Sequence, residues 1–237
     1  MKRIASLAIV CVSLISYVWA DSGEKERERI TASNIVLKEI MNAPDKGIPG
    51  DVFGGTKCVI ILPSVKKGAF IVGASYGRGV MSCKTGQDFN GPWSAPIMMA
   101  LEQGSLGFQI GGEGTDFVIL VTNDAGARAV MKSKVKLGAD ASVAGGPVGR
   151  TAEASTTGSM KAEMLSYSRS QGVFAGVSLS GASLRVDGDA NKSLYGEKVT
   201  PEQIMAGSVP MPPAAKPMIE TLRDATAKAK QEKAATK

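Results

Sequence analysis

The sequence predicts an α+β fold, in which a predominantly antiparallel β-sheet or partly closed barrel of glycine-rich strands carries an N-terminal amphipathic helix and short C-terminal helices. Three observations favour this class. Apolar runs rich in β-forming residues recur at short intervals along the chain. Glycine, with 28 residues, is frequent within and between these runs. The intervals show little helical periodicity, whereas a parallel sheet would need a helix between successive strands.

The first twenty residues have the pattern of a signal peptide. Lys2 and Arg3 precede an apolar segment over residues 7–15, and the small residue Ala20 ends the pattern. We expect cleavage near Ala20 and export to the periplasm or cell envelope. Cys11 lies inside the apolar segment, so we do not expect it to carry a lipid.

Residues 30–41 are predicted to form an amphipathic helix. At 100° per residue its apolar side chains share one face, whereas Lys38 lies on the opposite face. The apolar set is Ile30, Val36, Leu37, Ile40 and Met41. Pro44 follows and ends the pattern. Two interpretations stay open: the helix packs on the domain core, or its apolar face enters a membrane interface.

Three apolar runs before residue 90 predict a meander of antiparallel strands. The predicted strands are 57–63, 69–75 and 80–84, and the predicted turns are 64–68 and 76–79. Glycine in both turns suits a tight connection between strands. Lys66 and Lys67 would be exposed on the first turn.

The two cysteines that follow the predicted leader, Cys58 and Cys83, both lie in predicted strands. Unpaired cysteine is commonly a small buried hydrophobic residue, so two buried thiols are one interpretation. Export would place the pair in an oxidising compartment, where a Cys58–Cys83 disulfide would persist. The sequence leaves both interpretations open.

The stretch from Gly91 to Gly114 is dense in glycine and proline and is predicted to lie in the middle of the sheet. Apolar residues alternate with small or polar ones over 106–110, which is the period of a half-buried strand. The run 115–122 that follows is apolar and rich in β-formers. We therefore expect two strands joined by a glycine-rich turn at 111–114.

A short helix is expected over residues 125–131, because Asn123 or Asp124 can cap its start. Lysines then recur with period two, at Lys132, Lys134 and Lys136. On a strand these lysines share one face, and the apolar residues between them face the core. We interpret the lysine face as solvated, with a membrane-facing lysine row as the alternative.

The segment from 164 to 207 is predicted to hold two further strands and a capped helix. The strands lie at 164–169 and within 171–184. Residues 187–191 resemble the start of an EF-hand loop, but lysines stand where that loop needs glycine and glutamate, so a turn is predicted. Thr200-Pro-Glu-Gln203 is typical of a helix start with a capping box.

The chain is predicted to divide into three parts. Residues 1–20 are the signal peptide, and residues 21–207 form one domain that includes the N-terminal helix. Residues 208–237 are predicted to be a proline-rich linker and a basic, partly disordered tail.

Histidine is absent from all 237 residues. This excludes Ser-His and Cys-His nucleophile pairs, histidine-ligated zinc and histidine general-base catalysis. The carboxylates show no paired spacing that indicates an acid–base site, so we expect no enzyme activity and no cofactor. No basic block carries interleaved aromatic residues, so nucleic acid is not an expected partner. The net charge of +6 permits binding to an anionic surface.

Three long motifs resemble the SYLF domain family, also called the Ysc-type actin-binding domain. They read GPWSAPIMMALEQGSLGFQIGGEGTDFVILVTN, KVKLGADASVAGGPVGR and YSRSQGVFAGVSLSGASL, in the order of the family. The resemblance implies a lipid-binding module. Eukaryotic members bind phosphoinositides and, in the fungal branch, actin, and an N-terminal amphipathic helix contributes to membrane contact in some of them. Bacterial members are typically short exported proteins with one such domain, and the layout of this chain is similar.

We therefore expect an exported protein that associates with anionic phospholipid membranes through the amphipathic helix and basic turns. The expected contact residues are Lys25, Arg27, Arg29, Ile30, Leu37, Lys38, Met41, Lys66 and Lys67. The basic residues would attract anionic headgroups, and the apolar helix face would be buried in the interface. The alternative is a structural or protein-interaction module of the cell envelope with no lipid ligand.

Overall fold

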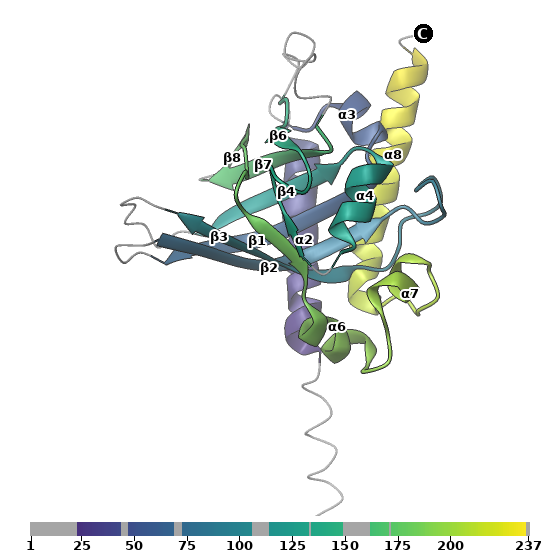
Figure 1. Cartoon of the computed structure of the whole chain (residues 1–237). Coiled ribbons are helices and arrows are strands. Elements are labelled where there is room, and N and C mark those ends of the chain that lie inside the picture. Colours follow the sequence, from purple (N-terminus) through teal and green to yellow (C-terminus); the bar gives the residue numbers. More distant parts are fainter. Residues whose placement is uncertain are drawn as a thin grey trace, which may run out of the picture.

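The structure is a computed structural model that describes residues 23–43, 47–68, 73–105, 114–132, 134–148, 162–170 and 172–235. The predicted signal peptide, the predicted strand at 106–110 and most of the predicted turn at 111–114 lie outside the described residues. Figure 1 shows a bent sheet with α2 and α8 on one face and α4 on the other.

In the described part of the chain, nine strands form one sheet in the order β5-β9-β3-β2-β1-β4-β7-β6, and β8 pairs with β7. The strands are β1 (Cys58–Gly68), β2 (Gly73–Cys83), β3 (Ile97–Ser105), β4 (Thr115–Val121), β5 (Lys134–Lys136), β6 (Val143–Gly145), β7 (Met164–Ser170), β8 (Val173–Gly176) and β9 (Ser183–Val186). All pairings are antiparallel except the pairing of β6 with β7. The predicted α+β class with a predominantly antiparallel sheet is confirmed.

The predicted turns at 64–68 and 76–79 are wrong, because both segments lie inside long strands. Strand β1 continues past a register shift between Ile61 and Lys66, where Ser64 takes a left-handed φ of 51°. The glycines of β2 do not form a turn; they allow β1 to pack closely against β2. A Cβ on Gly79 would lie 1.9 Å from the carbonyl oxygen of Ile61, so only glycine allows the two strands to approach.

One face of the sheet is covered by α2 (Glu24–Asn42), α3 (Gly50–Gly54) and α8 (Lys216–Ala235). Ile30, Leu37 and Ile40 of α2 are completely buried in the cluster between these helices and the sheet. Of the two interpretations of the amphipathic helix, the structure shows the packed one. The helix also begins six residues earlier than its apolar pattern suggested, at Glu24.

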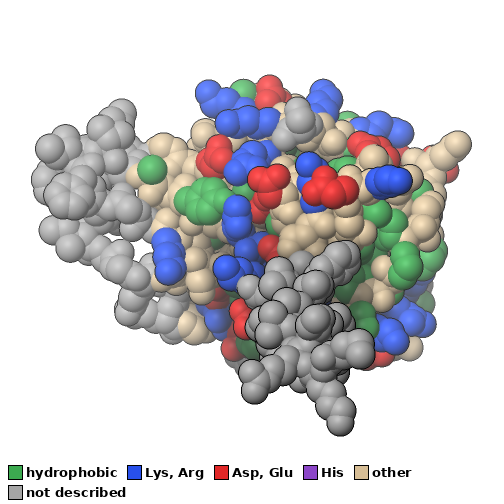
Figure 2. All heavy atoms as spheres, turned by 90° about the horizontal axis from the view of Figure 1, so that it is seen from below, with side chains coloured by type: hydrophobic (Ala, Val, Ile, Leu, Met, Phe, Trp, Pro, Cys, Tyr) green, Lys and Arg blue, Asp and Glu red, His purple; other side chains and the backbone are tan. Residues whose placement is uncertain are grey.

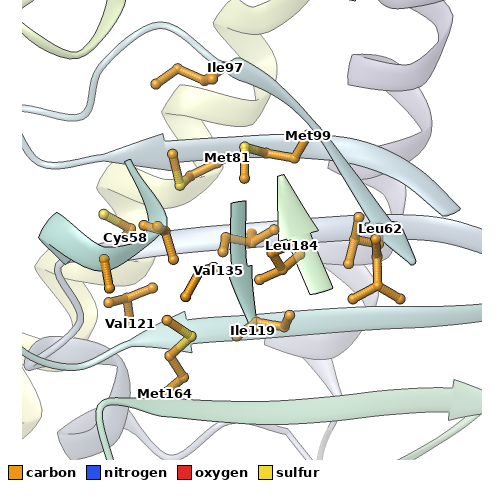
Figure 3. Close-up of a cluster of buried hydrophobic side chains, with 14 of the residues drawn as sticks. Cys58, Leu62, Met81, Ile97, Met99, Ile119, Val121, Val135, Met164 and Leu184 are labelled. Carbon is orange, nitrogen blue, oxygen red and sulfur yellow. The ribbon is translucent and has the colours of Figure 1, made fainter. Parts of the chain in front are cut away.

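The opposite face holds a second buried cluster, shown in Figure 3. Val135 of β5 and Leu184 of β9 belong to the same cluster as Ile119 of β4 and Met164 of β7, although these strands are far apart in the sheet order. This is possible because the sheet curls back over itself as a half-barrel. Helix α4 (Asp124–Val130) packs on the same face, and Asn123 caps it by accepting from the amide of Gly126, as predicted.

Cys58 and Cys83 lie directly opposite each other on β1 and β2 within this second cluster, and both side chains are completely buried. A disulfide joins them, with an S–S distance of 2.08 Å. Of the two interpretations that the sequence left open, the structure shows the bonded pair.

Residues 187–205 form two short helices, α6 (Gly188–Tyr195) and α7 (Pro201–Met205). The predicted turn at 187–191 is instead the start of α6, where the Asp187 side chain accepts from the amide of Ala190 at 3.4 Å. The capping box of α7 is confirmed, because Thr200 and Gln203 each bond the other's backbone amide.

The segment predicted to be a proline-rich linker and a partly disordered tail is largely helical instead: after the short 3-10 helix η2 (Pro213–Ala215), α8 runs for 20 residues. Its five buried residues share one face of the helix, because apart from the adjacent first two they are three or four positions apart: Met218, Ile219, Leu222, Ala225 and Ala229. The last two are alanines, so the alanine- and lysine-rich composition hid an amphipathic pattern. Residues 216–235 therefore belong to the domain.

Candidate functional site: a basic cleft beside the N-terminal helix

A cleft of about 520 Å³ lies between the first turns of α2 and the paired strands β1 and β2. Its walls are formed by Lys25, Glu28, Arg29 and Ala32 from α2, Pro63, Ser64 and Lys66 from β1, and Tyr76, Gly77 and Arg78 from β2. Three residues that the sequence singled out, Lys25, Arg29 and Lys66, therefore meet at one site. We refer to it as the basic cleft.

Local structure explains why these side chains converge. Positions 25, 28, 29 and 32 are three, four and seven apart, so they form one stripe along α2. On β2, Tyr76 and Arg78 have the same parity as Val80, whose side chain packs in the cluster on the α2 side of the sheet. The intervening Gly77 has no room for a side chain, because its Cβ would lie 2.4 Å from a methyl group of Val65.

The rim of the basic cleft carries two exposed lysines, Lys25 and Lys66. Neither forms an ion pair with any other described residue. Glu28 is the one carboxylate that lines the cleft among the described residues. Cations thus outnumber carboxylates on its walls, and two of them are free to attract an anion.

The floor of the basic cleft is a partly buried charge network. Arg29 Nη1 is buried without a hydrogen-bond partner in the described structure and lies 3.9 Å from Glu26 Oε1. Burial lowers the pKa of Arg29, and the nearby Glu26 carboxylate opposes that effect. The guanidinium is therefore short of acceptors, which favours an additional negative group close to it.

Arg78 is held more firmly than Arg29. Its Nε donates to the Tyr76 hydroxyl at 2.7 Å and lies 3.1 Å from Asp187 Oδ2. The hydrogen bond to Tyr76 raises the pKa of Arg78. The Arg78 side chain remains 42% exposed, whereas that of Asp187 is 2% exposed. The cation therefore faces the surface and its counter-charge lies beneath it.

The other predicted contact residues lie elsewhere. Ile30 and Leu37 have no exposed surface, so they could meet a membrane only if α2 left the sheet, and their contact with lipid stays a prediction. Lys38 and Met41 line a different groove of about 370 Å³ between α2 and α8. Arg27 does not line the basic cleft. Lys67 lies in β1, and its side chain is not among those that the structure describes.

Tyr76 and Arg78 were missed because their segment was interpreted as a turn. Both could have been found by extending the period-two pattern of β2 across its glycines, because that pattern places Tyr76 and Arg78 on the same face as Val80. Figure 2 shows the side of the molecule with α6 and the N-terminal end of α2, where Lys and Arg side chains gather with Asp and Glu among them.

The described chain has no cluster of three or more cysteine, aspartate or glutamate side chains arranged to hold a metal ion. Within the described ranges, no helix has the length and apolar character needed to cross a bilayer.

Comparison with known proteins identifies one family. The family described as Ysc84, Las17-binding protein actin regulator, matches residues 102–225. An SH3 domain-containing protein of Schizosaccharomyces pombe is 35% identical over 202 residues, covering 84% of this chain and 46% of the relative. LAS seventeen-binding protein 3 of Saccharomyces cerevisiae is 35% identical over 204 residues, covering 85% of this chain and 43% of the relative.

A mammalian protein is similar over a comparable number of residues. SH3 domain-containing YSC84-like protein 1 of Homo sapiens is 34% identical over 192 residues, covering 81% of this chain and 55% of the relative. The chain spans about half the length of the curated relatives it matches.

Proposed function

The chain belongs to the Ysc84 family, the SYLF domain family that its motifs indicated, and we propose that it binds anionic phospholipid surfaces through the basic cleft. The observation that carries the proposal is the convergence of Lys25, Arg29, Lys66 and Arg78 on one cleft that holds a single described carboxylate.

Magnitudes support a contact of this kind. A lysine or arginine near an anionic membrane surface contributes about 1 kcal/mol of attraction. The four cations of the cleft would together supply a few kcal/mol by this estimate, and Glu28 with the carboxylates beside Arg29 and Arg78 reduces that sum, so the association would be weak and reversible. The cleft volume of about 520 Å³ falls within the range of about 300–1,000 Å³ typical of small-ligand sites, so it is large enough for a lipid headgroup.

We propose that docking leaves α2 packed on the domain. Releasing the helix would expose Ile30, Leu37 and Ile40, which are completely buried. It would also break polar contacts along its length, from Glu26 to Ser193 and from Glu39 to Arg169. Binding by charge at the surface avoids these costs, so the basic side of α2 acts without insertion of its apolar side.

Co-sedimentation with vesicles tests this proposal. The full chain is mixed with vesicles of phosphatidylcholine alone or of phosphatidylcholine with phosphatidylglycerol, at low and high salt. The K25Q/K66Q/R78Q variant removes three cleft cations. A matched variant, R223Q/K230Q/K233Q, removes the same residue types from exposed positions on α8.

We expect salt-sensitive binding to the anionic vesicles, weakened on the order of 100-fold in the cleft variant and much less in the α8 variant. Any contribution of the N-terminal segment is the same in all three proteins. Equal binding by the cleft variant and the α8 variant would show that the cleft is not the contact. No binding of the parent protein at low salt would end the proposal.

Export is part of the same proposal. The pattern of residues 1–20 supports it, and the Cys58–Cys83 disulfide suits an oxidising compartment. Mass spectrometry of the protein recovered from its native source should give an N-terminus close to Asp21. A mature protein that retains Met1 or Lys2 would contradict this part.

A protein-binding role is the second candidate, because the family and the Saccharomyces cerevisiae relative are named for binding Las17. The groove of about 370 Å³ between α2 and α8 supports it, since Lys38, Thr221, Asp224 and Lys228 line it with mixed charge. Ile35, on the outer side of α2, is an exposed large apolar residue. Cross-linking in the native extract should capture one partner at stoichiometric level, and K38E/K228E should abolish that capture without changing vesicle binding.

A further inference from the structure

We propose that the lipid-binding surface extends beyond the cleft as a cationic band across β2, β9 and β5, and that this exposed strip of the sheet, beside the part that α2 covers, lies against the bilayer. The band consists of Arg78, Arg185, Lys134 and Lys136. The inference rests on the proposed function and adds the docking face to it.

Strand register places these residues in two adjacent rows. In the first row, Arg78 lies opposite Ala100, Ala100 opposite Arg185, and Arg185 opposite Lys134. Only a methyl group separates the two arginines within that row. The second row runs through Tyr76, Glu102, Ser183 and Lys136.

Both rows lie on the side of the sheet that carries α2. Val80 and Met98 have the same parity as Arg78 and Ala100, and both pack in the cluster beneath α2. On β5, Val135 faces the opposite cluster, which leaves Lys134 and Lys136 on the α2 side. Arg78 belongs to both the cleft and the band, so the two surfaces are continuous.

The band keeps its charge exposed. The side chains of Arg78, Arg185 and Lys134 are 42%, 33% and 57% exposed. Glu102 alone serves two of these cations: it accepts from Arg185 Nε at 2.8 Å and lies 3.4 Å from Lys134 Nζ. The hydrogen bond to Arg185 lowers the pKa of Glu102, so this carboxylate stays charged near neutral pH.

Two further acidic groups lie next to the band. Asp187 is buried beneath Arg78, and Asp140 accepts from the backbone amide of Lys136. The side chain of Lys136 is exposed and makes no ion pair with other described residues. The surface charge therefore remains positive, with Tyr76 as its one large exposed apolar side chain among the described residues.

The spacing of the band fits an extended anionic plane better than one bound ion. Neighbouring strands lie about 4.8 Å apart, so three strand steps separate Arg78 from Lys134, which is roughly 14 Å measured along the curved sheet. Charges spread over such a distance contact several anionic headgroups at once. A flat bilayer offers that contact without any apolar pocket, and the band has none.

Three variants of the full chain test the band with the same vesicles. K134Q/K136Q/R185Q removes two lysines and one arginine, as the α8 variant R223Q/K230Q/K233Q does. E102Q removes the carboxylate that the band shares. Circular dichroism and urea unfolding verify that each protein is folded. If the triple variant fails to fold, the exposed single variant K136Q replaces it.

Removing one cation should weaken vesicle binding roughly fivefold, since each contributes about 1 kcal/mol near an anionic surface. We therefore expect the band variant to lose affinity on the order of 100-fold and K136Q roughly fivefold. E102Q should gain affinity roughly fivefold, a change of opposite sign that a general loss of structure cannot produce. The α8 variant should stay close to the parent protein.

Other outcomes overturn the inference. If the band variant binds like the α8 variant while the cleft variant loses binding, the docking face is wrong and the proposed function stands. If no variant differs from the parent protein, the cleft and the band both fail. Binding to soluble polyphosphate without binding to vesicles would assign the surface to a soluble polyanion instead of a membrane.

Discussion

Close backbone approach decides which residue is tolerated at position 79. A Cβ there would lie 1.9 Å from the carbonyl oxygen of Ile61 and 2.8 Å from Leu62 Cα, so the β1 and β2 strands would have to separate. We expect Gly79→Ala to lower the free energy of unfolding by about 1–3 kcal/mol. Urea unfolding measures it, and Gly104→Ala is the control, since a Cβ at that strand position meets nothing within 4 Å. Similar losses in both variants would contradict the packing role of Gly79.

The disulfide is the other single-residue feature that can be measured directly. We expect C58A/C83A to lose about 3 kcal/mol of stability, because the bond closes a loop with a sequence separation of 25 residues. Alkylation of the denatured, unreduced protein should leave both cysteines unmodified in the mass spectrum. Modification of both would show that the thiols are free in the isolated protein.

For single residues, the sequence predicted features that act locally better than positions that depend on how strands and helices pack. The absence of histidine and the capping residues Asn123 and Thr200 could be interpreted directly, because each acts locally. Arg78 could not be assigned to a site, because its position depends on β1 and α2 meeting β2. The glycines on either side of it favoured a turn, whereas tertiary packing required them in a strand.

Among the elements, α2 links fold and function. Its buried side carries the completely buried Leu37, and its outer side carries Ile35, which is 54% exposed. We expect Leu37→Ala to cost about 2–5 kcal/mol of unfolding free energy and Ile35→Ala much less. At a temperature where both variants are folded, binding of Leu37→Ala to anionic vesicles should match that of the parent protein.

The outcome for Leu37 separates two uses of the helix. If α2 entered the interface, Leu37→Ala would weaken vesicle binding in the folded protein, because the burial energy of the lost methyl groups would come from lipid. A stability loss without a binding loss supports the packed helix. A binding loss with unchanged stability would contradict the packing of Leu37 in this structure.

The sequence predicted the half-barrel class but not its boundaries. Alternation and the spacing of apolar runs were sufficient for an antiparallel sheet, since those signals repeat over many residues. The lysine face of β5 was also predicted, with Val135 inward, as the structure shows. The curl that brings β5 and β9 over β4 depends on non-local pairing and could not be found from any single segment.

For the whole molecule, the last helix is the most informative test. Helix α8 covers α2, α3 and the Trp93 side chain, whose indole N–H donates to Thr226 at 3.1 Å. A chain that ends at Pro212 would expose Trp93 and Phe53, which are now 6% and 0% exposed. We expect this truncated chain to lose cooperative urea unfolding and to bind a hydrophobic dye.

A chain that ends at Lys230 is the control, because the described residues that it lacks, 231–235, are all exposed. We expect it to unfold cooperatively and to leave the dye unbound, as the parent protein does. If the chain that ends at Pro212 unfolds cooperatively at the parent's midpoint, α8 is a peripheral tail, and the buried apolar stripe along it has no stabilising role.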